Sequence, residues 1–265
     1  MKELHDRGVL SSGQFSTAEV SAYYDTFAEG TNRVGQYMNF GLWFDRTVTH
    51  REACDNLMND LIGNIRSREG RVLDAACGFG ATTQYLTRYW RPTDIVGINL
   101  TAAQIGVCVR TAPACRFFAM DATALDFDAE SFNNIICVEA AQHFCTREKF
   151  LREALRILKP GGMLVMSDLL LFEEAFAMGN LFPAENYLPS PEAYYALLVD
   201  VGFSKVDLVD ITESGWCSYA RFVVKSAHER WFAGATSFAH LQRTLSYIYA
   251  GIAKFSHNLI VRAQK

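Results

Sequence analysis

Two glycines separated by one residue, Gly78 and Gly80, end a short apolar segment that begins at Val72. Glycine lets the backbone approach a ligand closely, and a helix starting just after the second glycine would present unpaired N–H groups there. A strand, turn and helix in this order typically hold a nucleotide. The third glycine of the dinucleotide fingerprint would fall at Thr83, and the next apolar segment ends in Asn99 instead of an acidic residue. Both departures argue against a nicotinamide- or flavin-dependent oxidoreductase.

Polar side chains also follow the next three apolar segments. Asn99 ends the first of them, Asp121 follows the second and Glu139 follows the third. An amide at a strand end can reach the hydroxyls of a ribose, and a carboxylate can accept a hydrogen bond from an exocyclic adenine amine. His143 comes four residues after Glu139 and is the candidate proton acceptor, because an imidazole is mostly neutral at cellular pH.

Alternating strands and helices would bring these residues together. Hydrophobic periodicity predicts strands at 71–76, 94–99, 115–120, 133–138, 163–168 and 205–211. It predicts helices at 81–89, 102–111, 146–158 and 191–201. Lys159-Pro160-Gly161-Gly162 should stop a helix and turn tightly into the next strand. This alternation indicates a parallel sheet covered on both faces, with the polar residues above at one edge.

Two regions depart from the alternation. The first 70 residues have helical patterns at 17–27 and 50–65, and residues 214–255 form a helical block rich in aromatic residues. We therefore divide the chain into an N-terminal helical cap (1–70), an α/β core (71–213), a helical insertion (214–256) and a final strand (257–265). Both helical parts are expected to cover the carboxyl ends of the strands, and the insertion to wall an acceptor pocket. A packing layer remote from the site is the rival interpretation of that insertion.

Composition excludes several classes of protein. The formal net charge is −4 with scattered basic residues, which argues against a nucleic-acid partner. Residues 1–20 are polar and no segment is apolar enough to span a membrane, so a cytoplasmic location is expected. The seven cysteines form no CxxC pair and are expected to be buried thiols. No metal site is expected, since His143 and Cys145 have no partners at suitable spacing.

Taken together, the motifs resemble those of class I S-adenosylmethionine (SAM)-dependent methyltransferases. The resemblance runs from about Val72 to Asp168, continues weakly over 206–210 and includes the last strand. It rests on the D-x-x-x-G-x-G turn, the polar strand tip, an Asp-Ala pair and L-K-P-G-G. The Asn-Leu-Thr at 99–101 and the Glu-x-x-x-His at 139–143 are similar to the small-molecule branch, which includes sugar O-methyltransferases and relatives of tocopherol and sterol C-methyltransferases. The fold that this implies is α/β: a doubly wound, Rossmann-like, seven-stranded mixed sheet with an antiparallel last strand and helical lids at both ends of the chain.

The resemblance also implies which residues hold SAM. Asp74, Gly78 and Gly80 would line its methionine and ribose, Asn99 would meet the ribose, and Asp121 with Ala122 the adenine. The further residues assigned to the cofactor site are Tyr23, Ala76, Leu100, Gln104 and Glu139. The family commonly has an acidic residue in place of Asn99, and often a glycine in place of Ala76. Because alanine disfavours positive φ, we expect an ordinary backbone conformation at Ala76.

The same resemblance implies O-methylation of a small secondary metabolite. A histidine after the fourth strand acts as the base in such enzymes, so His143 would remove the proton and Asp168, at the end of the neighbouring strand, would orient it. C- or N-transfer to a prenyl-like, aromatic or amine acceptor is the alternative, and a non-catalytic SAM-binding module is an alternative of another class. Partners beyond the small-molecule acceptor are not expected, although the sequence leaves a homo-oligomer open.

Overall fold

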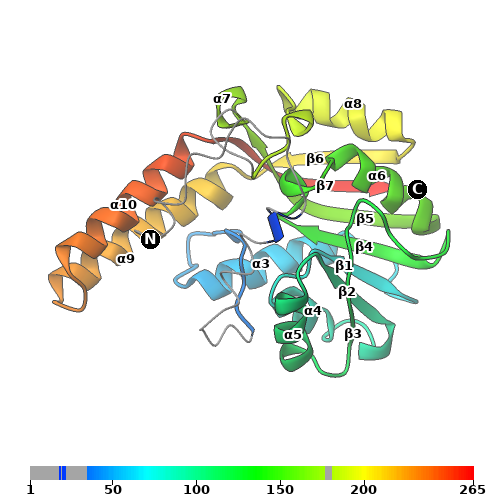
Figure 1. The fold of residues 1–265 in the computed structure, drawn as a ribbon, viewed down its shortest axis with the longest axis horizontal. Coiled ribbons are helices and arrows are strands. Elements are labelled where there is room, and N and C mark those ends of the chain that lie inside the picture. The colour runs from blue at the N-terminus through cyan, green and yellow to red at the C-terminus, as the bar shows by residue number, and fades with distance from the viewer. Residues whose placement is uncertain (1–17, 19, 22–34, 177–180) are drawn as a thin grey trace.

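A seven-stranded sheet forms the centre of the molecule (Figure 1). The computed structural model describes residues 18, 20–21, 35–176 and 181–265, so Tyr23 and most of the helix predicted at 17–27 lie outside the described residues. The strands are β1 (Val72–Ala75), β2 (Ile95–Asn99), β3 (Arg116–Ala119), β4 (Phe132–Val138), β5 (Leu158–Leu171), β6 (Ser204–Asp210) and β7 (Phe255–Gln264). Their order is β3-β2-β1-β4-β5-β7-β6, and β7 is antiparallel to both of its neighbours. The predicted doubly wound mixed sheet is confirmed.

Side-chain caps begin several helices where the sequence predicts them. Thr49, Thr101, Thr146 and Ser190 each accept a hydrogen bond from a backbone N–H in the first turn of the helix that follows. The α-helices whose bounds lie within the described residues are α3 (His50–Gly63), α4 (Ala81–Leu86), α5 (Ala102–Thr111), α6 (Arg147–Ile157), α7 (Glu173–Phe176), α8 (Pro191–Val201), α9 (Ser218–Phe232) and α10 (Phe238–Ile252). Short 3-10 turns lie at Pro92–Asp94, Ala141–His143 and Ala184–Asn186, and a π-helical turn at Glu213–Cys217.

The helices cover both faces of the sheet. Because successive strand residues point to opposite faces, Val72 packs with Leu57 of α3 and Leu86 of α4, whereas Leu73 belongs to the core formed with α6 and α8. Strands β1 and β2 are buried along their whole length, as expected for parallel strands covered on both sides. The helix predicted at 50–65 therefore packs on a sheet face. The prediction that it caps the carboxyl ends of the strands is wrong.

Two strands extend beyond their predicted limits. Strand β5 begins at Leu158, directly after α6, and the backbone groups of Gly161 and Gly162 pair with Lys265. The Lys-Pro-Gly-Gly segment interrupts the pairing with β4, since Leu158 pairs with Phe132 and Met163 with Asn134, and Gly161 has φ +77° as a tight turn requires. The predicted turn is therefore present, and Lys265 supplies its hydrogen-bond partners. The final strand begins at Phe255, ahead of the predicted boundary at 257, because its first residue pairs with Leu171 of the elongated β5.

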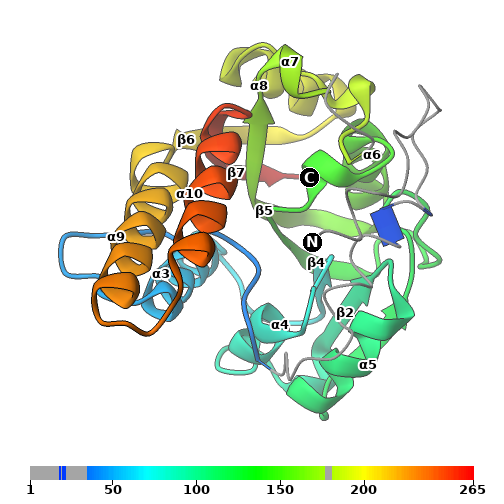
Figure 2. The ribbon, with the colours of Figure 1, turned by 60° about the vertical axis from the view of Figure 1, so that its left-hand side comes forward.

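Helices α9 and α10 form an antiparallel hairpin that projects from the body of the molecule (Figures 1 and 2). At its base, Trp216, Ala220 and Ile248 pack against Phe40 and Phe255. The remainder extends away from the sheet. The helical insertion was expected to lie over the carboxyl ends of the strands, but it contacts the body mainly through this aromatic base.

Candidate active site

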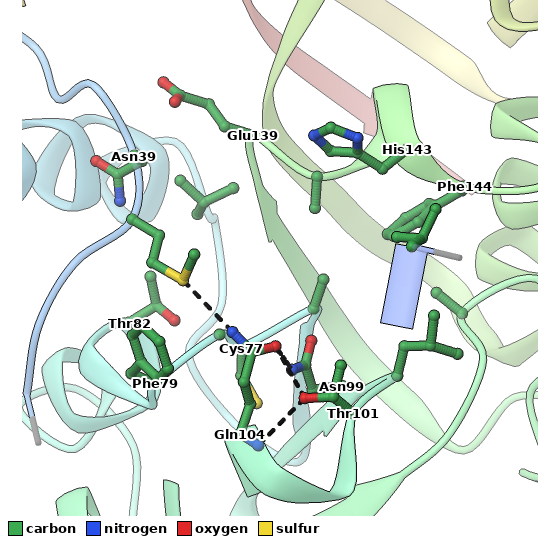
Figure 3. A pocket seen from close by; sticks show the side chains of 18 of the residues that line it. Asn39, Cys77, Phe79, Thr82, Asn99, Thr101, Gln104, Glu139, His143 and Phe144 are labelled. Carbon is green, nitrogen blue, oxygen red and sulfur yellow. Dashed lines mark hydrogen bonds between the residues drawn. The ribbon is translucent and has the colours of Figure 1, made fainter. Parts of the chain in front are cut away.

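A cavity lies at the carboxyl ends of β1, β2 and β4, where ligands bind in open α/β sheets. The space inside it, including its open mouth, is about 1030 Å³. The predicted site residues that line it are Ala76, Gly78, Asn99, Leu100, Gln104, Asp121, Ala122, Glu139 and His143. Three predicted residues, Asp74, Gly80 and Asp168, are not part of its wall. Figure 3 shows Asn99, Thr101 and Gln104 at one end of the cavity and Glu139 and His143 at the other.

Of the two glycines in the turn, only Gly78 leaves room for a ligand to approach the backbone closely. Gly78 has φ +55°, and a Cβ there would meet only the side chain of Met38, at 3.5 Å for its sulfur. A Cβ on Gly80 would lie 3.0 Å from Cα of Cys108, so this glycine serves the packing of α5 against the turn. Ala76 has φ +60°, which corrects the prediction of an ordinary conformation. The turn imposes a left-handed residue at this position even though alanine disfavours it.

Asp74 holds the glycine turn from behind. Its side chain is 1% exposed, and one carboxylate oxygen accepts hydrogen bonds from the hydroxyls of Thr82 (2.6 Å) and Thr83 (2.5 Å). Burial raises the pKa of Asp74 to about 6, although these two hydrogen bonds act in the opposite direction. Asp74 was predicted to line the ligand site, but in this structure its side chain does not reach the cavity wall. Its carboxylate instead fixes the start of α4, and Thr83, which replaces the third glycine of a dinucleotide site, is one of its donors.

The end of β2 presents an ordered amide to the cavity. Asn99 donates its side-chain N–H to Oε1 of Gln104, and Thr101 donates its hydroxyl to the same oxygen at 3.1 Å. The amide N–H of Gln104 points to the sulfur of Met38 at 3.5 Å (Figure 3). Since the N–H side of Asn99 is occupied in this way, its carbonyl oxygen is the group suited to accept a hydrogen bond from a hydroxyl. Gln104 acts here as the anchor of Asn99.

Asp121 follows β3 and is held in place by its own loop. Its Oδ1 accepts hydrogen bonds from the backbone N–H and the hydroxyl of Thr123, both at 2.8 Å. This is the capping arrangement that short acidic side chains often form at a turn. The carboxyl also lines the cavity beside Met120 and Ala122, so capping orients the group toward a ligand.

A segment ahead of α3 completes the wall, although none of its residues was predicted to belong to the site. Gln36, Tyr37, Met38 and Asn39 all line the cavity. The carbonyl of Asn39 lies 2.7 Å from Nε2 of His50, and the N–H of the next residue, Phe40, donates to Glu139 at 2.9 Å. We call residues 36–40 the strap. No local periodicity marks it, because its conformation depends on contacts with α3 and β4.

Glu139 joins the strap to the sheet. The residue has φ +49°, and its half-buried carboxyl lies at the cavity wall. The carboxyl accepts hydrogen bonds from Phe40 N–H and, at 3.4 Å, from the hydroxyl of Ser167. Burial raises its pKa to about 8, and both hydrogen bonds act in the opposite direction. Glu139 therefore holds its proton at neutral pH in the absence of a ligand.

This carboxyl makes stability depend on pH in a defined direction. Its pKa of about 8 in the folded chain lies above its ordinary value of 4.5, so the folded chain keeps a proton that the unfolded chain has lost. The free energy of unfolding should consequently fall as the pH rises from about 4.5 to about 8, with a slope of at most about 1.4 kcal/mol per pH unit. Asp74 adds to this slope only below about pH 6.

We expect Glu139→Gln to remove most of the decline between about pH 6 and pH 8, because the amide has the same shape and no proton to lose. Urea unfolding of the ligand-free protein across this range measures it. Glu173→Gln, which changes an exposed carboxyl, is the control and should keep the wild-type slope. Equal slopes for Glu139→Gln and the wild type would show that Glu139 is ionised throughout.

His143 points into the cavity from the 3-10 turn that follows β4 (Figure 3). Its ring stacks on Phe182 with centroids 4.9 Å apart, and Nδ1 lies 2.9 Å from the carbonyl oxygen of Leu181. A carbonyl can only accept a hydrogen bond, so Nδ1 must carry the proton and Nε2 the lone pair. Burial lowers the pKa of His143, which keeps the imidazole neutral.

Asp168 does not orient His143, and that prediction is wrong. Its Oδ2 accepts hydrogen bonds from Arg147 Nε at 2.7 Å and from the hydroxyl of Tyr194 at 2.8 Å, while Oδ1 accepts from the N–H of Leu169. Arg147 and Asp168 are 1% and 0% exposed. A buried arginine needs a carboxylate partner, and Asp168 is that partner. The carbonyl of Leu181 takes the role expected of Asp168.

Within the described residues, the helical insertion supplies no part of the cavity wall. The insertion was predicted to form the acceptor pocket, and the rival interpretation, a packing layer remote from the site, agrees with the structure. The described residues also contain no group of three or more metal-binding side chains in reach of one ion. None of the described helices has the length and apolarity needed to cross a membrane.

Part of the chain is similar in sequence to known methyltransferases. Residues 73–166 match the family model described as a methyltransferase domain. Erythromycin 3''-O-methyltransferase from Saccharopolyspora erythraea is 27% identical over 74% of this chain and 72% of its own length. The 27-O-demethylrifamycin SV methyltransferase from Amycolatopsis mediterranei is 30% identical over 58% of this chain and 59% of its own length. The chain spans only 42% and 37% of two further, mycobacterial, relatives.

The chain therefore contains a methyltransferase domain, at residues 73–166, and the relatives named above are methyltransferases. The structure of geranyl diphosphate C-methyltransferase from Streptomyces coelicolor A3(2), in complex with S-adenosyl-L-homocysteine, shares this fold. It superposes with a TM-score of 0.69 at 15% identity, over 94% of this chain and 97% of that one. The predicted fold and the predicted enzyme class are thereby confirmed.

The residues present in this methyltransferase fit SAM. Gly78 leaves backbone open to the cavity, Asn99 offers an amide oxygen at the β2 end, and Asp121 offers a carboxyl at the β3 end. Asn39, which is 5% exposed, adds a buried Oδ1 that has no hydrogen-bond partner among the described residues. An orphaned buried acceptor in a cavity wall is explained by a ligand that donates to it.

Proposed function

We propose that this methyltransferase methylates a hydroxyl group of a small secondary metabolite, with His143 as the proton acceptor. The observation that supports it most directly is the position of His143. This imidazole, held in one tautomer by Leu181, lines the same cavity as the residues that fit SAM. Both relatives described above carry names of enzymes that modify small metabolites, and one of them is named as an O-methyltransferase.

SAM, when bound, supplies an electrophilic methyl group. Asn99 and Asp121 would hold its ribose and adenine, and the strap with Ala76 and Gly78 would enclose its methionine end. The acceptor would then lie at the opposite end of the cavity, between Glu139, His143 and Phe144. A hydroxyl is a weak nucleophile, so it gains from transferring its proton to Nε2 of His143 as it attacks. Hydrogen bonding of Nδ1–H to Leu181 orients the ring for this transfer and stabilises the imidazolium that forms.

Product analysis with a panel of acceptors tests the proposal. The purified protein would be incubated with SAM and metabolites that carry a free sugar or aglycone hydroxyl, an amine, or a prenyl chain. Mass spectrometry should show the gain of one methylene on oxygen in at least one hydroxyl compound. Transfer only to nitrogen or carbon would replace the proposal by the alternative of C- or N-methylation, which the geranyl diphosphate C-methyltransferase fold also accommodates.

The proposed contact between Asp121 and the adenine of SAM leads to a separate prediction. Asp121→Ala should weaken SAM binding by about 1–3 kcal/mol, the usual cost of losing a hydrogen bond to a buried polar partner. Isothermal titration calorimetry measures the affinity directly. Thr123→Ala separates this effect from loosening of the loop, since Thr123 donates to the same carboxyl, and Asp126→Ala is an exposed control. Unchanged affinity in Asp121→Ala would remove the residue from the site.

A further inference from the structure

The hairpin of α9 and α10 differs in charge from the rest of the molecule. Residues 218–254 contain five basic side chains and a single acidic one, Glu229, for a formal charge of +4. The whole chain has a net charge of −4, so the other residues together carry −8. The five basic residues of the hairpin are Arg221, Lys225, Arg230, Arg243 and Lys254. A basic projection on an acidic protein indicates a partner with negative charge.

Basic residues near the far end of the hairpin are available to such a partner. Arg230 lies in the last turn of α9 and Arg243 in the second turn of α10. Both residues are exposed, and neither forms an ion pair with any described residue. Closer to the base, Arg221 and Lys225 are paired with Glu213 and Glu229. Lys254, at the base, also forms no ion pair with a described residue, so two of the three unneutralised charges lie toward the end that points away from the body (Figure 2).

That same end carries an exposed aromatic cluster. The ring of Trp231 contacts those of Phe232 and Phe238, with centroids 4.9 and 5.6 Å apart. Phe232 is 78% exposed and Phe238 is 54% exposed. The turn between them, residues 233–237, reads Ala-Gly-Ala-Thr-Ser and contains no charge. We call Arg230–Phe238 together with Arg243 the hairpin tip.

We propose that the hairpin tip binds the surface of an anionic membrane. Large aromatic rings flanked by arginines favour the boundary between lipid headgroups and acyl chains, where the rings are buried and the guanidinium groups meet phosphates. The small, uncharged turn can enter the headgroup layer without desolvating a charge. Phe232 and Phe238 insert, and Arg230 and Arg243 provide the electrostatic attraction. Because no described helix can cross a membrane, this contact is peripheral.

A second copy of the chain fits the tip less well. Two hairpins that met tip to tip would bring Arg230 and Arg243 of both copies together, and the tip contains no acidic side chain to compensate. Like charges at an interface oppose association. The active-site cavity lies on the sheet edge and contains no described residue of the tip, so the proposal does not depend on the reaction that the enzyme performs.

Flotation with lipid vesicles tests this proposal. The full-length protein should float with vesicles of phosphatidylcholine and phosphatidylglycerol and remain unbound with vesicles of phosphatidylcholine alone. Since each basic residue near an anionic surface contributes about 1 kcal/mol, Arg230→Glu/Arg243→Glu should weaken binding by roughly tenfold or more. Arg91→Glu/Arg110→Glu changes the net charge equally on the body of the molecule and should bind as the wild type does.

Insertion of the aromatic rings is tested separately. Phe232→Ser/Phe238→Ser should reduce binding to the anionic vesicles, whereas Phe118→Ser, which changes an exposed phenylalanine of β3, should not. Circular dichroism melting establishes that each variant is folded. Absence of flotation with anionic vesicles, or equal binding of the tip variants and their controls, overturns the proposal. So does a concentration-dependent dimer in sedimentation that Phe232→Ser/Phe238→Ser dissolves, because the tip would then be a self-association surface.

Discussion

Replacing His143 by alanine should lower kcat by about 10²–10⁴-fold, the range that general-base catalysis contributes. The affinity for SAM should stay unchanged, because the residues that fit the adenosine moiety lie at the other end of the cavity. The loss follows from the local chemistry. Nδ1–H donates to the carbonyl of Leu181, so Nε2 is the nitrogen that can take a proton from a hydroxyl. Steady-state kinetics and calorimetry with SAM measure the two quantities separately.

The pH profile of kcat offers an independent check of His143. Burial lowers the pKa of this imidazole, so its neutral form should persist as the pH falls below its ordinary value of 6.5. Activity should decline only at lower pH, when the ring becomes protonated. His143→Gln, which keeps a polar side chain without a titratable nitrogen, should lose kcat as His143→Ala does and lose this acid limb. Near-normal turnover in both variants would point to an amine acceptor or to another base.

Breaking the buried pair of Arg147 and Asp168 should have the largest effect on stability. We expect Asp168→Asn to lower the free energy of unfolding by about 3–5 kcal/mol, because it leaves the charge of Arg147 uncompensated in the core. The pair is 2.7 Å apart and almost fully buried, and Arg147 also donates to the carbonyls of Asn186 and Leu169. For a chain of this size the midpoint of thermal unfolding should fall by roughly 6–20 °C.

Urea denaturation of two further variants separates this effect from general damage to the core. Arg147→Met/Asp168→Leu removes both charges and should recover part of the lost stability, since apolar residues often replace a buried ion pair at little cost. Arg152→Gln breaks an exposed pair of the same length, with Glu148, and should cost less than about 1 kcal/mol. If Asp168→Asn unfolded like the wild type but lost turnover, Asp168 would belong to the catalytic machinery after all.

The sequence alone identified most of the residues that line the cavity at the strand ends. Gly78, Asn99, Asp121 and Glu139 each stand at or just after the end of a parallel strand, and the line of such ends is a property of the topology. Hydrophobic runs locate the strands, and a capping residue such as Thr101 marks where a helix starts, so these positions follow from local patterns. The Asn-Leu-Thr and Glu-x-x-x-His motifs then indicated the small-molecule branch of the family, which the comparisons confirmed.

Only the tertiary structure decided which of these side chains face a ligand and which hold the fold. Asp74 and Asp168 both look available in the sequence, yet each has a partner elsewhere in the chain, Thr82 and Thr83 for one and Arg147 for the other. A carboxylate in the core must be hydrogen-bonded or paired, and its partner is chosen by packing, which periodicity does not encode.

The tertiary structure also determined the positions of the strap and the hairpin. Phe40 meets Glu139 across 99 positions of sequence, and that contact places Asn39 at the cavity wall. The helical insertion has the aromatic content of a substrate lid, but Trp216 packs on Phe40 at its base and the rest of it projects from the body. Residue types and local spacing determined the sheet, its helices and the polar strand ends. Long-range contacts determined the orientation of His143, the strap over the cavity and the direction of the hairpin, because each depends on which distant surfaces are buried against one another.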